Sequence, residues 1–266
     1  MNARRLTLPI TSIVRESSSV GTFTFSGQLD VRPGQFLMIT DYQTGEKPFS
    51  VSCVGEGMFS VTLRTVGPFT ESVSRLDVGD FVGIRGAFGS SFFVPTDRKV
   101  LLIGGGCGTP PLHFLAQQLV RKRNTVLLLN GARTAAELLF TNRFEALGVQ
   151  TRAASEDGAA GPAGTVVDLA ERLLERERFD RAYAAGPELM LAALRPLLRG
   201  KSTPHQFLLE RYMKCGIGIC GSCAMDRSGI LLCVEGPVVD DETLANLAEF
   251  GSYRRDESGR KVRFSG

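Results

Sequence analysis

The first hundred residues alternate between short apolar runs and turn-forming residues. Val, Ile, Phe and Thr dominate the runs, and turns such as Arg32-Pro33-Gly34 and Val78-Gly79-Asp80 separate them. Many short strands at close spacing are typical of a small antiparallel barrel. The expected strands cover residues 6–17, 21–25, 35–40, 50–54, 59–65 and 81–85.

The pattern changes at Lys99. A continuous apolar run at 100–103 is followed by a glycine loop, by a helical pattern at 112–123 and by a second apolar run at 125–129. Strands that alternate with helices predict βαβ units on a parallel sheet. Further alternating segments cover residues 135–146, 166–176, 182–185 and 188–198, and 153–164 has the composition of a surface loop.

Glycines and cysteines dominate from Lys201 onward, which predicts a third, small unit. We therefore expect a multi-domain α+β chain with three parts. An N-terminal antiparallel β-barrel would span residues 1–97, a central α/β parallel-sheet nucleotide-binding domain 98–204, and a small cysteine-rich domain 205–266.

Composition excludes several classes of protein. The chain has 266 residues, 43% of them hydrophobic, so it is neither disordered nor collagen-like. A net charge of +3 without a block of one sign gives no basis for a nucleic-acid surface. No run approaches the ~20 apolar residues of a membrane span, and Met1 leads into a strand-like segment instead of a signal core. We expect a cytoplasmic protein.

Four of the six cysteines lie close together near the C-terminus, at the spacing C-x4-C-x2-C-x9-C: Cys215, Cys220, Cys223 and Cys233. The first three match the spacing of plant-type [2Fe–2S] sites. The glycines between them let the backbone wrap around a cluster and point N–H groups at its sulfurs. A zinc site or buried structural thiols are the alternatives, but zinc sites usually pair two short cysteine knuckles, and only one is present. The fourth cysteine is expected on a strand, 230–233.

A glycine loop, Gly104-Gly105-Gly106-Cys107-Gly108-Thr109, follows the first buried strand of the α/β part and opens a helix. That context suits a pyrophosphate at a helix N-terminus, although the loop is not a full G-x-G-x-x-G and can equally be a tight structural turn. A second turn, Gly186-Pro187, again lies between a strand and a helix, where ligands bind in open α/β sheets. Its alternative is an ordinary connection.

Within the barrel, Lys47-Pro48-Phe49-Ser50 brings a cation, a rigid ring, an aromatic group and a hydroxyl together between a turn and a strand. These groups, with Arg64 and the segment 67–70, can hold the phosphates and ring of a flavin. Ordinary barrel surface is the alternative.

Taken in order, KPFS, GGGCGTPP, AAGPELM and ERYMKCGIGICGSC resemble the ferredoxin-reductase-like electron-transfer subunits of NAD-linked dihydroorotate dehydrogenases. The resemblance covers nearly the whole chain, and the cysteine segment is its most specific part. It implies FAD in the barrel, NAD in the α/β domain and a [2Fe–2S] cluster in the C-terminal domain.

Carried over by position, the resemblance implies three sets of binding residues. The cluster ligands would be the four clustered cysteines. The nicotinamide dinucleotide would meet Gly104, Gly105, Gly106, Gly108, Thr109, Gly186 and Pro187. The FAD residues would be Lys47, Pro48, Phe49, Ser50, Thr62, Leu63, Arg64, Phe69 and Thr70.

Three positions depart from the family pattern. Lys47 replaces an arginine and keeps its charge without the bidentate fork. Phe69-Thr70 stands where a Gly-Thr pair is usual near the phosphates. Ala185 stands where such reductases carry a cysteine before Gly-Pro, which leaves no thiol beside the nicotinamide.

The implied activity is that of an NAD(P)-linked flavin and iron–sulfur oxidoreductase subunit in pyrimidine biosynthesis, with no side chain acting as a catalytic nucleophile. A separate FMN-bearing catalytic subunit would oxidise dihydroorotate, and electrons would pass through the cluster and FAD to NAD⁺. We expect a heterotetramer of two copies of each subunit, and no dihydroorotate oxidation by this chain alone.

Two alternatives stay open at this point: a reductase subunit of a hydrogenase or of a ferredoxin:NADP oxidoreductase, and a zinc-bearing binding module on a reductase-like scaffold. The choice between NAD and NADP is also open. Arg133 can meet a 2′-phosphate or remain a solvated charge. His113, in the helix after the glycine loop, is expected to be a satisfied or surface histidine.

Overall fold

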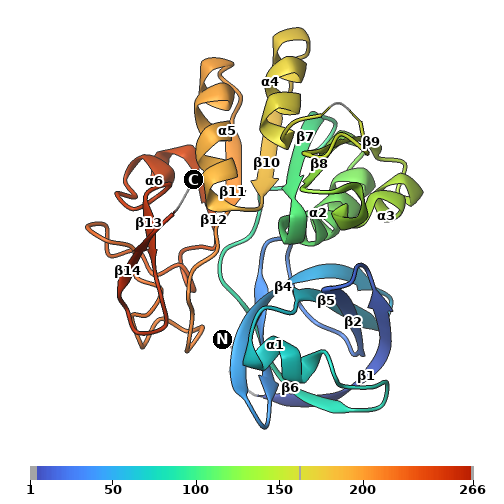
Figure 1. Ribbon diagram of the computed structural model, residues 1–266, viewed down its shortest axis with the longest axis vertical. Helices are drawn as coiled ribbons and strands as arrows, with labels where there is room; N and C mark the ends of the chain where they lie inside the picture. The colour runs from blue at the N-terminus through green and yellow to red at the C-terminus, as the bar shows by residue number, and fades with distance from the viewer. Residues whose placement is uncertain (1–4, 162, 265–266) are drawn as a thin grey trace.

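The computed structural model describes residues 5–161 and 163–264 (Figure 1). Residues 1–4, 162 and 265–266, which the predicted domain ranges include, lie outside the described part.

Six antiparallel strands close a barrel in the order β1-β2-β5-β4-β3-β6, as the sequence predicted. Alternating side chains such as Phe23, Leu37 and Val61 fill its interior and are at most 3% exposed. The elements are β1 (Leu6–Arg15), β2 (Val20–Ser26), β3 (Phe36–Asp41), β4 (Gly45–Gly55), β5 (Met58–Arg64), the short helix α1 (Pro68–Val73) and β6 (Phe81–Phe88).

Strand β4 begins earlier than predicted, so Lys47-Pro48-Phe49-Ser50 lies within the strand and not before it. The first half of β4 pairs only with β3, for example Pro48 with Met38, and pairing with β5 starts at Val51. A proline is tolerated there because its missing N–H has no second neighbouring strand to serve.

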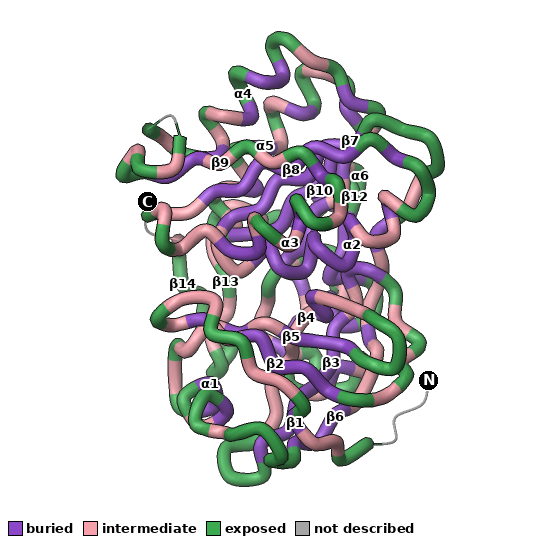
Figure 2. Tube along the Cα trace, turned by 90° about the vertical axis from the view of Figure 1, so that its right-hand side faces the viewer, coloured by how far each residue is buried: buried purple, intermediate pink, exposed green. Residues whose placement is uncertain are grey.

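A six-stranded sheet follows, in the order β12-β11-β10-β7-β8-β9, and all neighbours are parallel except β11 and β12. The central strands β7, β8 and β10 are largely buried because helices cover both faces, whereas the edge strand β9 is partly exposed (Figure 2). The bounds are β7 (Lys99–Gly105), β8 (Thr125–Ala132), β9 (Gln150–Ser155), β10 (Arg181–Ala185), β11 (His205–Leu208) and β12 (Val238–Asp240).

Helices α2 (Thr109–Arg121) and α3 (Thr141–Ala146) pack on one face of this sheet, and α4 (Val166–Arg176) and α5 (Glu188–Gly200) pack on the other. Two single 3₁₀ turns, η1 (Gly106–Gly108) and η2 (Ala135–Glu137), complete the α/β part. Helix α2 also contacts the barrel, where a ring nitrogen of the buried His113 lies 3.2 Å from the carbonyl oxygen of Ser52. His113 is thus a satisfied histidine, as expected.

The cysteine-rich segment leaves the sheet after β11 and returns to it at β12. The chain then forms α6 (Asp241–Ala245) and a small hairpin of β13 (Tyr253–Arg255) and β14 (Lys261–Arg263), which lies beside the cysteine segment in Figure 1. Because β11 and β12 are hydrogen-bonded into the central sheet, the topology favours a third unit that starts after Leu208. The three-domain division with a boundary at 205 stays a prediction.

The expected strand at 230–233 is wrong. Leu231 makes a single β-bridge with Ala224, and the chain turns immediately, with the N–H groups of Val234 and Glu235 donating to the Leu231 carbonyl. The run is apolar because Leu232 and Cys233 pack into the core, at 0% and 2% exposure, and not because it belongs to a ladder.

None of the helices in the described residues combines the length and the apolarity that a membrane crossing requires.

Candidate functional site

The four clustered cysteines line one loop and approach each other as two pairs. Cys220 approaches Cys215, whose Sγ lies 3.5 Å from the Cys220 nitrogen, and Cys233 approaches Cys223, whose Sγ lies 3.4 Å from the Cys233 nitrogen. Cys223 and Cys233 are buried, whereas Cys220 is exposed. The loop therefore offers one inner and one outer pair of thiols.

Backbone N–H groups point at these sulfurs. The N–H groups of Ile217, Ile219 and Cys220 lie 3.5, 3.4 and 3.5 Å from Cys215 Sγ. Gly218 N lies 3.2 Å from Cys233 Sγ, and Cys233 N lies 3.4 Å from Cys223 Sγ. Gly216 and Gly218 adopt positive φ of 73° and 80°, which lets the loop fold inward. The predicted wrapping of the glycine backbone around the thiols is confirmed.

This donor set fits a two-iron cluster. Each iron of a [2Fe–2S] centre takes two thiolates, and N–H···S bonds stabilise the charge on the sulfurs. In residues 5–161 and 163–264 no three His, Cys, Asp or Glu side chains stand as a single metal ion would need them. Burial opposes thiolate formation at Cys220, but hydrogen bonds with Ser222 and Cys215 outweigh it and lower its pKa to about 6. Burial raises the pKa of Cys233 to about 12, a cost that iron coordination would offset.

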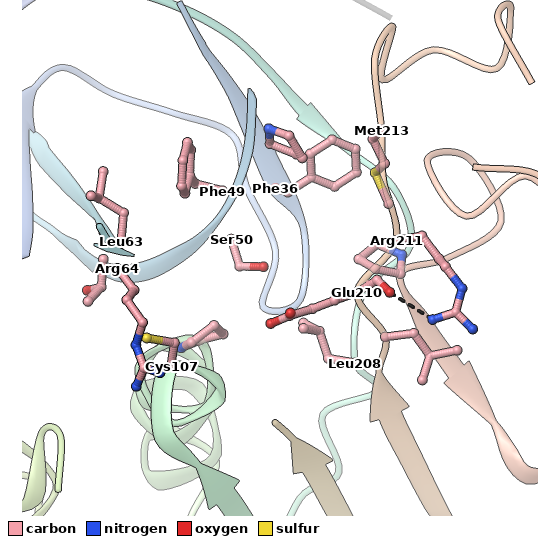
Figure 3. Close-up of a pocket in the computed structure, with 15 residues that line it drawn as sticks. Phe36, Phe49, Ser50, Leu63, Arg64, Cys107, Leu208, Glu210, Arg211 and Met213 are labelled. Carbon is pink, nitrogen blue, oxygen red and sulfur yellow. Dashed lines mark hydrogen bonds between the residues drawn. The ribbon is translucent and has the colours of Figure 1, made fainter. Parts of the chain in front are cut away.

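A cavity of about 270 Å³ lies between the barrel, the start of helix α2 and the segment that leads to Cys215 (Figure 3). Apolar side chains form much of its wall, among them Phe36, Leu208 and Met213. It takes in six of the nine predicted flavin residues: Pro48, Phe49, Ser50, Thr62, Leu63 and Arg64. An apolar wall with a few polar groups suits an isoalloxazine ring.

The other three predicted flavin residues lie outside this cavity wall. Lys47 Nζ donates to the Tyr212 hydroxyl at 2.9 Å. Phe69 stacks on Phe49 from behind, with ring centroids 5.9 Å apart. The Thr70 hydroxyl accepts the Val66 and Gly67 N–H groups at 2.8 and 3.1 Å and so shapes the turn before α1.

Arg64 and Arg211 are the two arginines that line this cavity, and Arg64 lies on the barrel side. The Nε of Arg64 is buried and has no hydrogen-bond partner in the described part of the chain. A buried guanidinium nitrogen without an acceptor is costly, so the position calls for an anionic ligand. Arg64 also lines a second cavity, which makes it the residue that the two cavities share.

The second cavity, of about 510 Å³, lies at the carboxyl ends of the parallel strands. Of the predicted dinucleotide residues, Gly105, Gly106 and Pro187 line it. Glu137, Glu156 and Arg133 add charges at its edge, and Arg133 Nη2 pairs with Glu137 Oε1 at 3.1 Å.

The remaining predicted dinucleotide residues stand behind that wall. A Cβ on Gly108 would lie 2.2 Å from the Ala185 carbonyl carbon, and one on Gly104 would lie 2.4 Å from Thr109 Oγ1. Gly186 has a φ of 154° and abuts Gly105. The Thr109 hydroxyl donates to Asn130 Oδ1 at 3.0 Å. These residues bring the two turns together at the strand ends.

A buried charge cluster ties the cysteine segment to the α/β part. Arg211 donates to both oxygens of Glu188 at the start of α5, and its Nε lies 2.9 Å from Glu249 Oε1. The three side chains are 4%, 7% and 1% exposed. Gly251 N donates to Glu188 and Asp226 N donates to Glu249, so the carboxylates have further partners.

Known proteins resemble the chain over nearly its full length. Residues 210–245 match the family described as the iron–sulfur cluster binding domain of dihydroorotate dehydrogenase B. A probable dihydroorotate dehydrogenase B (NAD(+)) electron transfer subunit from Methanothermobacter thermautotrophicus is 44% identical over 96% of both chains. The chain belongs to this family of electron transfer subunits. The Methanocaldococcus jannaschii member is 38% identical over 95% of this chain and 96% of its own.

Solved structures agree with the family's reductase-like fold. An NADH-dependent reduced ferredoxin-NADP oxidoreductase structure aligns at a TM-score of 0.81 and 29% identity, over 94% of this chain and 95% of its own. A ferredoxin NADP+ reductase from Neisseria gonorrhoeae shares the fold alone, with a TM-score of 0.65 at 19% identity over 75% of this chain and 92% of its own.

The sequence patterns did not predict that the segment before the cysteines forms part of a cavity wall. Leu208, Leu209, Glu210, Arg211 and Met213 all line the first cavity. The sequence carries no local signal for this role, because a charged pair such as Glu210-Arg211 is equally typical of a solvated linker. Cys107 lines the same cavity, and burial raises the pKa of its thiol, which fits a packed rather than reactive cysteine.

Proposed function

We propose that this chain is the electron-transfer subunit of an NAD-linked dihydroorotate dehydrogenase and serves pyrimidine biosynthesis. One observation carries the proposal. Arg64 lines both the first cavity and the strand-end cavity, and the segment that leads to Cys215 forms the other wall of the first cavity. Three carrier sites therefore adjoin in the order needed for electrons to pass from cluster to flavin to nicotinamide.

We assign the [2Fe–2S] ligands to Cys215, Cys220, Cys223 and Cys233, and FAD to the cavity of Phe49, Ser50 and Arg64. NAD would lie against Gly105, Gly106 and Pro187. FAD bound there would exchange electron pairs with nicotinamide and single electrons with the cluster. Arg64 would pair its unpartnered Nε with a phosphate, and Phe49, held by Phe69, would orient the flavin ring.

The cluster loop also contacts the barrel. Arg85 Nη2 donates to the Cys215 carbonyl at 3.1 Å, and a Cβ on Gly216 would lie 3.1 Å from Met38. These contacts fix the loop against the strands that wall the FAD cavity. On the opposite side Ile219 is 80% exposed beside Cys220, and we propose this side as the one that meets the FMN-bearing catalytic subunit.

We propose NAD⁺ and not NADP⁺ as the acceptor. The relatives at 38–44% identity carry NAD(+) in their names. Arg133, the candidate partner for a 2′-phosphate, is already paired with Glu137, and Glu156 adds a second negative charge to the cavity. The same relatives favour this assignment over a ferredoxin:NADP reductase, which the structure at 29% identity represents.

Reconstitution tests the division of labour. The chain loaded with FAD and cluster should pass electrons from NADH to an artificial dye and leave dihydroorotate untouched. Addition of the FMN-bearing subunit should create dihydroorotate-dependent NAD⁺ reduction. Cys220→Ser should block the second reaction and spare the first, because FAD can give electrons to the dye directly. Oxidation of dihydroorotate by this chain alone would overturn the proposal.

We further propose an assembly of two copies of each subunit, which light scattering on the reconstituted complex would measure. A cytoplasmic location is proposed as well, because none of the six cysteines forms a disulfide and clustered cysteines that hold iron fit a reducing compartment. Fractionation of the native cells tests it.

A further inference from the structure

The reduction of NAD⁺ consumes more than electrons. Each NADH formed takes two electrons and one proton, and the cluster delivers electrons alone, one at a time. One proton per turnover must therefore reach the flavin site from a protein group or from water. A protein group that supplies this proton should line the proposed FAD cavity.

Four side chains that line this cavity carry ionisable or reactive groups: Arg64, Cys107, Glu210 and Arg211. Arginine does not release its proton in proteins. Burial raises the pKa of the Cys107 thiol, and a neutral thiol is a poor source of protons near pH 7. The carboxyl group of Glu210 remains.

The Glu210 side chain points into the cavity from the segment between β11 and Cys215, toward Arg64 and Cys107 on the opposite wall (Figure 3). Its backbone is fixed from behind, because Arg211 Nη1 donates to the Glu210 carbonyl at 2.8 Å. Arg211 is itself held by Glu188 and Glu249. The carboxyl is thus aimed at the cavity by a rigid segment.

Charged groups surround Glu210 on several elements. The charges of Arg64, Arg254, Glu188 and Arg211 act on its carboxyl, and Cys107 lines the same cavity. Glu210 is an exposed residue whose side chain lines the cavity that a flavin would fill. Protein atoms packed around the carboxyl raise its pKa, and Arg254 and Arg64 oppose that rise.

We propose that Glu210 holds the proton that accompanies the two electrons to the flavin site; this rests on the proposed function. When both electrons have arrived, the O–H bond of the Glu210 carboxyl breaks and the proton moves into the cavity. The carboxylate that remains faces the Arg64 guanidinium, and water returns a proton to it. The sum per turnover is NAD⁺ plus two electrons plus one proton, giving NADH, and dihydroorotate supplies the electrons.

Two variants and one control test this role in the FAD-loaded, cluster-loaded protein. Glu210→Gln keeps the size and polarity but cannot release a proton, whereas Glu210→Asp keeps the acid. Glu175→Gln, an exposed acid on α4, is the control. The chain is combined with the FMN-bearing subunit, and the rate of dihydroorotate-dependent NAD⁺ reduction is measured per bound flavin across pH, because only electrons that arrive through the cluster need a separate proton. Direct hydride exchange between NADH and the flavin needs no such proton and is measured as an internal control. The infrared carbonyl band of a protonated carboxylic acid is measured in the resting protein.

We expect Glu210→Gln to slow the dihydroorotate-dependent NAD⁺ reduction by about 100-fold or more, to remove the pH break of the wild type, and to lose one carboxylic-acid band, while the direct hydride exchange changes little. Glu210→Asp should recover part of the rate and the pH break, and Glu175→Gln should match the wild type. An unchanged rate and pH profile in Glu210→Gln, or an unchanged infrared band, overturns the proposal. A wild-type protein that exchanges no electrons with NADH defeats the proposed function instead, and the infrared band still decides the state of Glu210.

Discussion

Lys47 on strand β4 donates a hydrogen bond from Nζ to the hydroxyl of Tyr212 at 2.9 Å, and its ammonium lies 4.5 Å from the centroid of the Tyr212 ring. The cation predicted to hold a flavin phosphate is thus engaged with the segment that leads to the cysteines. Arg64, in contrast, keeps a buried nitrogen without an acceptor. Lys47 therefore links the barrel to the segment that precedes the cysteines, and we expect Arg64 to be the main phosphate partner.

Flavin retention should depend on Arg64 more than on Lys47. Loss of a charge-assisted hydrogen bond costs about 1.5–3 kcal/mol, so Arg64→Gln should weaken FAD binding by about tenfold to a hundredfold. Lys47→Ala should change it only a few-fold. Equilibrium titration of the apoprotein with FAD measures both. A larger loss of FAD affinity in the Lys47 variant would mean that Lys47, and not Arg64, binds the FAD phosphate.

The cluster should depend on Cys220 and not on the barrel cysteine. Cys220→Ser should abolish the electron paramagnetic signal of the reduced [2Fe–2S] centre, because each iron needs two thiolates. Cys53→Ser is the matched control, since Cys53 belongs to β4 and its sulfur meets the Gln117 amide. An intact signal in the Cys220 variant would remove it from the ligand set.

The buried Arg211 should matter far more to stability than an exposed arginine with an equally good partner. Arg211→Met leaves Glu188 and Glu249 without their cation and should lower the free energy of unfolding by about 3–5 kcal/mol. Arg123 pairs with Asp97 through two bonds of 2.8 and 2.7 Å, but both side chains are exposed. Arg123→Met should cost little stability, because solvent screens exposed ion pairs. Urea denaturation measures both variants, and equal losses would contradict the buried network.

The glycine loop and the Gly186-Pro187 turn approach each other so closely that a side chain at Gly108 would clash. A Cβ there would lie 2.2 Å from the Ala185 carbonyl carbon, which is backbone and cannot rotate away. Gly108→Ala should cost about 1–3 kcal/mol and weaken NADH binding, because the turns separate. Gly200→Ala, with no atom within 4 Å of the new carbon, is the control and should be neutral or slightly stabilising. Thermal unfolding and NADH titration test the pair.

Nicotinamide preference should respond to Glu137. Glu137→Gln releases Arg133 from its 3.1 Å ion pair and removes a negative charge from the cavity. We expect the ratio of kcat/KM for NADPH over NADH to rise about tenfold, a difference of about 1.4 kcal/mol. Steady-state kinetics with a dye acceptor measure it. No change in the ratio would mean that Arg133 does not reach the ribose.

Local patterns predicted the barrel, the parallel sheet and the cysteine loop, because each depends on periodicity or spacing within one segment. The wall of the FAD cavity could not be predicted in the same way. Arg64 and Glu210 face one another only because strand β5 and the segment after β11 meet in space. The run at 230–233 was misread as a strand because burial, and not ladder pairing, makes it apolar. Lys47 as a flavin contact stays a prediction, and its hydrogen bond to Tyr212 could not be read from the sequence because Tyr212 lies far along the chain.

Strands β11 and β12 are antiparallel neighbours, and Leu209 N donates to the Pro237 carbonyl at 2.9 Å just beyond them. The cysteine segment therefore leaves and re-enters the sheet at neighbouring positions, as a long insertion between two paired antiparallel strands. Loss of the cluster would therefore leave the ladder between the two strands in place, but it would loosen the wall of the first cavity, because the segment before Cys215 lines that cavity. Oxidants or chelators that remove the iron should weaken flavin retention before they unfold the sheet.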